Sequence, residues 1–569
     1  MALLEIIGPV MVGPSSSHTA GAVRLGNLAR AILDDEPAHA IITLHGSFAA
    51  TGRGHGTDLA LVAGLLGLTP ADERIPESRE LARQCGLDVT FRAADLSPAH
   101  PNTALFELTG RNGGAAVVWG RSLGAGKVEV FRIGDLDVQL SGEYATLVLF
   151  HEDRPGVIAA VTSSLAAGAV NIARMRVTRA AKGGRAITVL ELDQPAPAAT
   201  LMAIRAQPGI RKALAVPPLE GEAPAGTGST CSPPPPAELP AAKGVEPPGS
   251  GLRDPADFSS FRDLVQRASA YGLSLGKLAV REEARRQAVS PKTLQDAMAE
   301  RLRVMQRAIQ RGLSESPRSR SGLVGGDAAR LQKSAQAGQL LGGPVLAAAM
   351  ARALAVAEVN ACMGVVVAAP TAGSCGVLPG VLSAVAEALK APEERQVDAL
   401  FAAAAVGEVV AAGATLSGAE GGCQAEIGSA AAMAAAAAVE LAGGRAECAA
   451  HAAALALKGL MGLVCDPVCG LVEVPCVKRN ASAAAVALAC ADMAMAGVRS
   501  AVPPDEVITA VAQVGRAMPE SLRETGLSGL AATPTARRLC QACAGCNEAG
   551  PDLFRPGRHH SKFQTRDNP

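Results

Sequence analysis

Strand-like and helix-like patterns of apolar residues are mixed in the first 140 residues. Short apolar runs rich in β-branched residues, such as HAIITLHGSF and TALFELTG, predict strands. The runs TAGAVRLGNLARAIL and GTDLALVAGLLG place their apolar residues at helical intervals and predict helices. Residues 1–140 are therefore expected to form an N-terminal domain of the α+β class.

The pattern changes at Tyr144, where a second unit is expected to begin and to run to residue 219. The segment YATLVLFHEDRPGVIAAVTSSLAAGAVNIARMRVTRAAKGGRAITVLELD predicts a strand, a helix that opens after DRPG, and two strands joined by a KGG hairpin. A second helix in APAATLMAIRAQ and a strand in RKALAV complete a ferredoxin-like βαββαβ order. Pro155 suits the first helical turn, because its ring fixes φ at a helical value.

The rest of the chain divides into a linker, a helical domain and a tail. Residues 220–256 are rich in Pro, Gly, Ala and Ser and have no apolar period, which is typical of a flexible or partly polyproline linker. Residues 257–535 are dominated by alanine-rich apolar helices with glycine-rich turns, so an all-α domain is expected. Residues 536–569 hold three cysteines and are expected to form a flexible tail. The chain is therefore predicted to be a multidomain protein.

Composition narrows the partners to small molecules. The formal net charge is zero and aromatic residues make up 2% of the chain, so neither nucleic acid nor an anionic membrane is an expected partner. Arg352, Glu358 and Asp492 interrupt the apolar segments, which favours buried helices over membrane spans. The N-terminus lacks the pattern of a secretion signal, and thirteen cysteines scattered in apolar sequence do not form a secreted disulfide framework. A cytoplasmic protein is expected.

Three cysteines in the run VCDPVCGLVEVPC raise the question of a metal site. Cys465 and Cys476 stand in turns marked by glycine or proline, as does Cys423 in EGGCQAEIG, and such turns expose the backbone amides that an iron–sulfur cluster needs. Zinc is disfavoured, because the nearby His451 lies in an alanine-rich helix and the run has no paired C-x-x-C. A reducing compartment disfavours disulfides. Spacing alone leaves the cluster an open interpretation.

The motifs around these cysteines resemble a known family. PTAGSCGVLPG, EGGCQAEIGSAAAMAAAA and MGLVCDPVCGLVEVPCVKRNASAAAVALACADMA are similar to the α part of the bacterial iron–sulfur L-serine dehydratases. GPVMVGPSSSHTAGAVRLGNLAR and HGSFAATGRGHGTDLALVAGLLG are similar to their β part. The resemblance covers nearly the whole chain outside the linker and the tail. It implies a lyase, an L-serine ammonia-lyase that forms pyruvate and ammonia.

The resemblance also implies a cofactor. A [4Fe-4S] cluster would be held by Cys423, Cys465 and Cys476, and three thiolates on four irons leave one iron open to act as a Lewis acid on the serine hydroxyl. Pyridoxal phosphate is not expected, because Lys458 in ALKGLMG lacks the context of a Schiff-base lysine. Cluster chemistry with L-serine as the small-molecule substrate is therefore the leading hypothesis.

The base that removes the Cα proton is expected in the N-terminal part. The resemblance places His18 and His55 at the active site, and histidine suits proton transfer near neutral pH. His55 is preferred, because its flanking glycines would let substrate approach and Asp58 could orient its ring. From the residues alone, either histidine could instead serve a turn or a helix cap. The loop before the first long helix offers four hydroxyls that could bind substrate or cap that helix: Ser15, Ser16, Ser17 and Thr19.

A second loop, PTAGS, is expected to cradle a carboxylate with backbone amides and hydroxyls. Its candidate binding residues are Thr371, Gly373 and Ser374. Gly376 and Gly380 follow, and glycines there could let the backbone come close to a ligand.

The segment HEDRPGVIAAVTSSLAAGAVNIARM resembles an ACT domain, a small regulatory module that binds amino acids. The resemblance implies an amino-acid effector whose carboxylate meets free N–H groups at the helix start, beside Asp153, Arg154 and Gly156. The alternative is that this unit only packs or dimerises, and a homo-oligomer is an open option.

The other cysteines are expected to be structural, as free thiols among small apolar residues: Cys362, Cys375, Cys448, Cys469 and Cys490. Cysteines of the tail could cap the open iron, bind another metal or belong to a frayed end: Cys540, Cys543 and Cys546. Two other functions stay open. A lyase of similar build could act on L-cysteine or L-threonine, because pocket shape decides such preferences. The chain could also be a non-catalytic amino-acid sensor.

Overall fold

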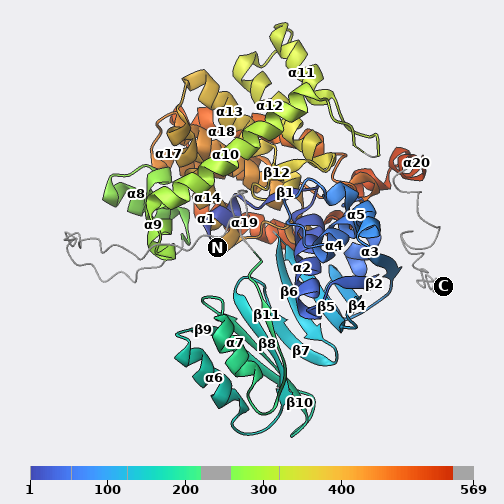
Figure 1. Ribbon diagram of the computed structural model, residues 1–569. Helices are drawn as coiled ribbons and strands as arrows, with labels where there is room; N and C mark the ends of the chain where they lie inside the picture. Colours follow the sequence, from blue (N-terminus) through green and yellow to red (C-terminus); the bar gives the residue numbers. More distant parts are fainter. Residues whose placement is uncertain (1, 53, 125, 220–257, 320, 543–569) are drawn as a thin grey trace, which may run out of the picture.

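The computed structural model has three parts (Figure 1), and it describes residues 2–52, 54–124, 126–219, 258–319 and 321–542. The expected linker, 220–256, lies outside the described residues, as do residues 543–569 of the expected tail. The helical part lies at the top of Figure 1, the N-terminal sheet beside and below it, and the second, smaller sheet at the bottom. The predicted multidomain organisation, with two sheet-containing regions and a helical C-terminal region, is therefore confirmed.

The N-terminal part is built on a six-stranded sheet of order β3-β2-β4-β5-β6-β7. Only β2 and β3 pair in parallel within this sheet. The strands are β2 (Pro37–Leu44), β3 (Asp88–Ala93), β4 (Thr103–Gly110), β5 (Ala115–Gly124), β6 (Lys127–Ile133) and β7 (Leu136–Leu140). The helices are α2 (Gly21–Leu33), α3 (Gly46–Thr51), α4 (Thr57–Leu65) and α5 (Ser78–Gln84). Helix α2 packs against α4 and against β5, and its buried apolar face forms part of the core.

The second part follows the strand–helix–strand–strand–helix–strand order, with an antiparallel sheet of order β11-β8-β10-β9. Its elements are β8 (Ala145–Glu152), α6 (Val157–Ala167), β9 (Ile172–Arg179), β10 (Arg185–Leu192), α7 (Ala198–Arg205) and β11 (Ile210–Val216). Helices α6 and α7 pack together on one side of the sheet (Figure 1). Val148, Ile187 and Leu214 join the core of the N-terminal part, so the smaller sheet is docked on the larger one.

The helical part forms the largest core. Its helices are α8 (Phe261–Tyr271), α9 (Leu275–Gln287), α10 (Pro291–Ser314), α11 (Asp327–Gln336), α12 (Gly343–Ala361), α13 (Val377–Leu389), α14 (Glu393–Gly413), α15 (Gly418–Gly421), α16 (Ser429–Leu441), α17 (Ala446–Gly459), α18 (Cys476–Met495), α19 (Pro504–Ala517) and α20 (Pro534–Ala542). Helices α14 and α16 pack through fully buried alanines, which combine high helix propensity with short side chains. Ser290 caps α10 by accepting the Thr293 N–H at 3.1 Å.

Most of residues 2–12, which belong to the expected N-terminal domain, pack against the helical part. Helix α1 (Leu3–Ile6) packs on α14, and strand β1 (Val10–Val12) pairs antiparallel with β12 (Val365–Val367). The Leu3 N–H donates to the Glu283 carboxylate at 3.0 Å. The expectation of an all-α domain is therefore wrong at residues 365–367, where a strand pairs with a distant segment that no local pattern reveals.

The start of the expected tail is ordered. Residues 534–542 form α20, and Cys540 on this helix makes a disulfide with Cys469, with 5.2 Å between the Cα atoms. The interpretation of Cys469 as a free structural thiol is therefore wrong. Residues 536–542, which were expected to belong to the tail, lie in α20. Cys543 and Cys546 lie outside the described residues.

Among the described residues, three segments are long and apolar enough, by length and composition alone, to cross a membrane: Gly343–Ala361, Ala372–Leu389 and Glu393–Gly413. Between 61% and 72% of the residues in their most apolar windows are buried inside the structure. Burial against other helices of the same chain accounts for this apolar character.

Candidate active site

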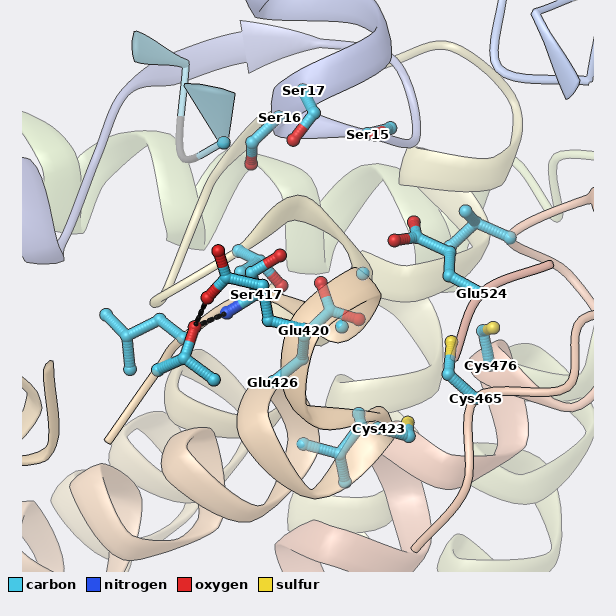
Figure 2. A pocket seen from close by; sticks show the side chains of 18 of the residues that line it. Ser15, Ser16, Ser17, Ser417, Glu420, Cys423, Glu426, Cys465, Cys476 and Glu524 are labelled. Atoms are coloured by element: carbon cyan, nitrogen blue, oxygen red, sulfur yellow. Dashed lines mark hydrogen bonds between the residues drawn. The ribbon is translucent and has the colours of Figure 1, made fainter. Parts of the chain in front are cut away.

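A cavity of about 240 Å³ lies where the N-terminal part meets the helical part. Ser15, Ser16 and Ser17 and the imidazole of His55 line it from the N-terminal side. The helical part contributes three cysteines and three carboxylates: Cys423, Cys465, Cys476, Glu420, Glu426 and Glu524. Figure 2 shows the serines on one wall and the sulfur atoms across the cavity from them. Both parts are therefore needed to complete this cavity.

The three cysteines are brought together from distant segments. Cys423 precedes a π-helical turn, Gln424–Gly428, which leads into α16, and Cys476 is the first residue of α18. Cys465 lies in the loop between α17 and α18. All three are free thiols that are at least 91% buried, with exposed fractions of 3%, 5% and 9% for Cys423, Cys465 and Cys476.

These thiols are costly to ionise without a cation. A hydrogen bond with the Cys423 thiol, together with burial, raises the pKa of Cys465 well above its ordinary value. Burial, with the charges of Cys423 and Glu426, raises the pKa of Cys476 in the same direction. A bound metal reverses this preference, because coordination stabilises the thiolate and releases the proton. Three buried thiols on one cavity therefore fit a site for a thiolate-ligated metal group.

The spacing of these groups does not fit a single metal ion. Across the described part of the chain, no group of three or more His, Cys, Asp and Glu side chains lies close enough to hold one ion. An iron–sulfur cluster spreads its thiolate ligands over several irons, so its cysteines stand further apart than those around one zinc ion. The cavity and the three free thiols are compatible with a cluster.

Two partly buried carboxyl groups at the cavity were not predicted. Burial raises the pKa of Glu426, against the hydrogen bond from the Thr371 hydroxyl. Burial and the nearby Glu426 raise the pKa of Glu524 to about 8. Glu426 lies three residues after Cys423 in a quoted motif, so its sequence position could have pointed to it. Glu524 has no such signal, because it follows the last long helix in an irregular segment.

His55 and His18 lie against each other, but only His55 lines the cavity. Their ring centroids are 4.5 Å apart, and His18 lies within hydrogen-bond distance of the Ser47 hydroxyl, with 3.0 Å from Nε2 to Oγ. Burial, and then the charge of His55, lowers the pKa of His18 well below its ordinary value. The expected partner of His55 is otherwise engaged, because the Asp58 carboxylate pairs with Arg79 at 2.7 Å.

The glycines beside His55 have a packing role that was not expected. A Cβ on Gly54 would lie 2.4 Å from the Leu471 side chain, in the loop between α17 and α18. A Cβ on Gly56 would lie 2.9 Å from Met363, and Gly56 has a left-handed φ of 65°. The glycines thus let the His55 loop approach the helical part. From the sequence, they were instead expected to let substrate approach.

The expected hydroxyl groups separate into two sets. Ser15, Ser16 and Ser17 line the cavity, and the Ser16 hydroxyl also accepts the Ala372 N–H at 3.0 Å across the junction. The Ser15 hydroxyl accepts the His18 N–H at 3.1 Å and so caps the π-helical turn Ser16–Ala20. The Thr19 hydroxyl donates to the His55 carbonyl at 2.8 Å and does not line the cavity. Thr19 therefore fixes the His55 backbone.

The residues of the PTAGS loop also fall into two sets, those that line the cavity and those that do not. Thr371 and Gly373 line the cavity, whereas the fully buried Ser374 hydroxyl is bonded within its own loop, to the Ala369 and Thr371 carbonyls at 3.3 Å each. Gly376 and Gly380 serve helix packing and do not line the cavity. A Cβ on Gly376 would lie 2.2 Å from a carbonyl oxygen of α12, and one on Gly380 2.7 Å from another.

The residues expected to bind an effector lie at the start of α6, in the smaller part at the bottom of Figure 1, and do not line this cavity. Gly156 is the residue before the helix, with a φ of 89°. The Asp153 carboxylate accepts the Gly183 N–H at 2.9 Å and pairs with Arg179 at 3.0 Å. Arg154 lies 4.0 Å from the Glu152 carboxylate. Asp153 is therefore engaged in holding the β9–β10 hairpin.

Three family models match the chain in succession. Residues 4–129 match the serine dehydratase beta chain, residues 145–209 the ACT domain, and residues 270–531 the serine dehydratase alpha chain. The three matches fall on the N-terminal part, the smaller sheet and the helical part.

Curated relatives show the same division. The probable L-serine dehydratase alpha chain of Bacillus subtilis is 50% identical over 285 residues, which cover 50% of this chain and 94% of the relative. The probable beta chain of the same organism is 42% identical over 192 residues, or 34% of this chain and 87% of the relative. The L-serine dehydratase TdcG of Escherichia coli is 29% identical over 545 residues, or 91% of this chain and 96% of the relative.

Proposed function

The chain belongs to the L-serine dehydratase family, with the beta-chain, ACT and alpha-chain regions in one polypeptide, and from this we propose that it converts L-serine to pyruvate and ammonia by iron–sulfur chemistry in the cavity between its two main parts. The family membership predicted from the sequence motifs is confirmed, and so is the lyase class. The observation that carries the proposal is the convergence of Cys423, Cys465 and Cys476 with His55 on one cavity.

The proposed cofactor is a [4Fe-4S] cluster, with Cys423, Cys465 and Cys476 as its ligands. When bound, it would supply a Lewis acid that turns the serine hydroxyl into a better leaving group. The three thiols are buried, unbridged and turned to the same cavity, which supports this assignment. They leave the remaining coordination position to substrate or to another group.

His55 is proposed as the base for the Cα proton. Of the two histidines it is the one that lines the cavity, as the three cysteines do, and a base must reach the proton that it removes. The His18 ring packs against the His55 ring. Because the pKa of His18 is lowered, His18 is neutral near pH 7 and puts no positive charge beside His55. Loss of the proton and the hydroxyl gives an enamine, which tautomerises to an imine and hydrolyses to pyruvate and ammonia.

The substrate carboxylate has one basic side chain available. Lys127, at the start of β6, is the only Lys or Arg among the described residues that line the cavity. Its ammonium group lies 3.7 Å from the carboxylates of Glu5 and Glu143 and is partly exposed. We assign the substrate carboxylate to Lys127 together with the hydroxyls of Ser17 and Thr371. The acidic groups Glu420 and Glu426 would face the substrate ammonium.

An amino-acid effector at the ACT region and a cytoplasmic location are further parts of the proposal. The start of α6 offers free backbone N–H groups beside Arg154, which suits a carboxylate. The reducing compartment is proposed because cluster thiols must be kept unoxidised.

The test is anaerobic purification followed by iron and sulfide analysis, with pyruvate formation from L-serine measured before and after exposure to air. About four irons and four sulfides per chain, with activity lost in air, are expected of an enzyme with an open [4Fe-4S] cluster. L-Cysteine and L-threonine serve as comparison substrates. A protein without iron whose activity survives air would overturn the cluster chemistry, and one without any lyase activity would favour the sensor.

A further inference from the structure

Arg479 joins two of the three cysteines through its guanidinium group. It lies in the first turn of α18, three residues after Cys476, so it moves with that cysteine. Its Nη1 donates to the Val464 carbonyl at 2.8 Å, and its Nη2 donates to the Asp466 carboxylate at 2.9 Å. The two acceptors stand immediately before and after Cys465. A planar guanidinium can hold two acceptors in fixed directions, which an ammonium group cannot do.

The Arg479–Asp466 pair is buried beside the thiols. The side chains are 16% and 4% exposed, so water screens the pair little. Burial opposes the charge on Arg479, but the nearby Cys423, Asp466 and Cys476 hold its pKa above the ordinary value. The same guanidinium favours the thiolate form of Cys476. Arg479 therefore places a fixed positive charge near two of the proposed ligands.

Asp466 extends this arrangement to the C-terminal segment. Its second carboxylate oxygen accepts the Leu530 N–H at 2.8 Å. The same segment pairs with Cys465 itself: the Cys465 N–H donates to the Leu522 carbonyl at 2.8 Å, and the Glu524 N–H donates to the Cys465 carbonyl at 2.9 Å. Cys465 is thus held on one side by Arg479 and on the other by the segment that brings Glu524 to the cavity.

We propose that Arg479 is a positioning residue for the cluster, which fixes Cys465 relative to Cys476 and offsets negative charge on the thiolate-ligated group. The inference rests on the proposed function, because it needs the cluster. Three thiolates carry more negative charge than an oxidised [4Fe-4S] core carries positive charge, and reduction adds one more negative charge. A neighbouring cation therefore stabilises the reduced form and raises the reduction potential. Partners of this outer kind commonly change metal affinity 10–100-fold.

The experiment uses full-length protein reconstituted anaerobically, with the variants R479K, R479Q and D466N. The control is R499Q, because Arg499 is 65% exposed and pairs with Glu447 away from the cavity. Three quantities are measured: iron and sulfide per chain, the rate at which a chelator removes the cluster absorbance, and the reduction potential. Circular dichroism and thermal unfolding of the cluster-free proteins monitor folding.

The variants separate the two roles of Arg479. R479Q loses both the positive charge and the two-acceptor geometry. We therefore expect cluster loss at least tenfold faster than in wild type and a lower reduction potential. R479K keeps the charge but not the two-acceptor geometry, so the cluster is lost faster at nearly unchanged potential. D466N removes a negative charge, so the potential rises. R499Q matches wild type.

The outcomes distinguish this inference from the proposed function. Wild type without iron and sulfide would overturn the proposed function itself. Wild type with a cluster and R479K with wild-type cluster lifetime would overturn the positioning role. An unchanged potential in R479Q would overturn the charge role. If R479Q does not fold, R479K still decides the positioning role, because it keeps both charges but not the two-acceptor geometry, and D466N decides the charge role, because a potential that does not rise would overturn it.

Discussion

The imidazole rings of His18 and His55 lie with their centroids 4.5 Å apart and tilted by 33°, at the junction of the N-terminal and helical parts. Two rings at this distance cannot both be positively charged imidazolium groups without a large cost in free energy. Burial and the neighbouring His55 lower the pKa of His18, and of the two rings only that of His55 belongs to a residue lining the cavity. This relationship separates the roles of the two histidines and makes them testable.

Replacement of His55 is expected to affect turnover far more than replacement of His18. H55Q should lower kcat about 10²–10⁴-fold, the usual contribution of a general base, with iron content unchanged. H18Q keeps the cavity wall and should cost about tenfold or less. Anaerobic pyruvate formation and iron analysis measure both effects, and H39Q, at an exposed histidine, is the control. Larger loss in H18Q than in H55Q would assign the base to His18.

How far the sequence predicts this site depends on how local each signal is. The cysteine motifs and the glycine-flanked His55 are visible as short runs, and the structure brings these residues to one cavity. Glu524 could not be predicted, because it reaches the cavity through backbone pairing with Cys465 rather than through a pattern of its own. Asp58 seemed a natural partner for His55 on the same segment, but Arg79 on α5 takes its carboxylate.

The same distinction holds for the fold. Alanine-rich helices and the succession of strands and helices in the second part follow from periodicity and turn residues, so these elements could be predicted. The pairing of β1 with β12 joins strands of three residues each, more than 350 positions apart. Neither strand is long enough for a period-2 pattern to emerge. The bond between Cys469 and Cys540 likewise joins residues 71 positions apart, and only the tertiary fold brings them together.

Lys127 is expected to contribute to substrate binding. K127M removes the one basic side chain lining the cavity among the described residues, and the loss of a charge-assisted hydrogen bond of about 1.5–3 kcal/mol should raise KM for L-serine roughly 10–100-fold. Iron content and the rate of cluster loss should not change. Steady-state kinetics under anaerobic conditions measure the effect, with K390M on the far end of α13 as control. A KM within twofold of wild type would remove Lys127 from the carboxylate site.

The raised pKa of Glu524 predicts that the free energy of unfolding of the cluster-free protein depends on pH. Its pKa is about 8 in the folded chain against an ordinary value of 4.5, so between these values the unfolded chain ionises and the folded chain does not. Stability is fully present below pH 4.5 and is lost as the pH rises towards 8, by roughly 1–4 kcal/mol. E524Q removes this dependence, because the amide does not titrate.

Urea unfolding of both proteins at pH 5, 6.5 and 8 measures the difference. The stability of E524Q relative to wild type should increase with pH. E520Q is the matched control, since Glu520 lies on the same C-terminal segment but is exposed. A difference that stays constant from pH 5 to 8 would show that Glu524 titrates normally.

The Cys469–Cys540 disulfide is expected to stabilise the attachment of α20. A cross-link that closes a loop of this length restricts the unfolded chain and commonly contributes about 2–4 kcal/mol. C540S should therefore unfold at lower urea concentration than oxidised wild type, and added dithiothreitol should bring wild type to the same value. C85S, at an exposed free cysteine, should match wild type. Equal stability of C540S and oxidised wild type would mean that the bond does not form in solution.

The packing of residues 3–12 predicts that the two main parts stay together without the linker. Leu3 and Ile6 are buried in the core of the helical part, β1 pairs with β12, and the buried Arg301 side chain donates to the Ile7 carbonyl at 2.7 Å. A protease site inserted within residues 220–256 allows the chain to be cut there after folding. The fragments should then elute together in size-exclusion chromatography and keep their activity. L3D/I6D should dissociate after the same cut, because two carboxylates would replace apolar contacts in the core. Separation of the wild-type fragments would show that the interface depends on the covalent connection, not on the N-terminal segment.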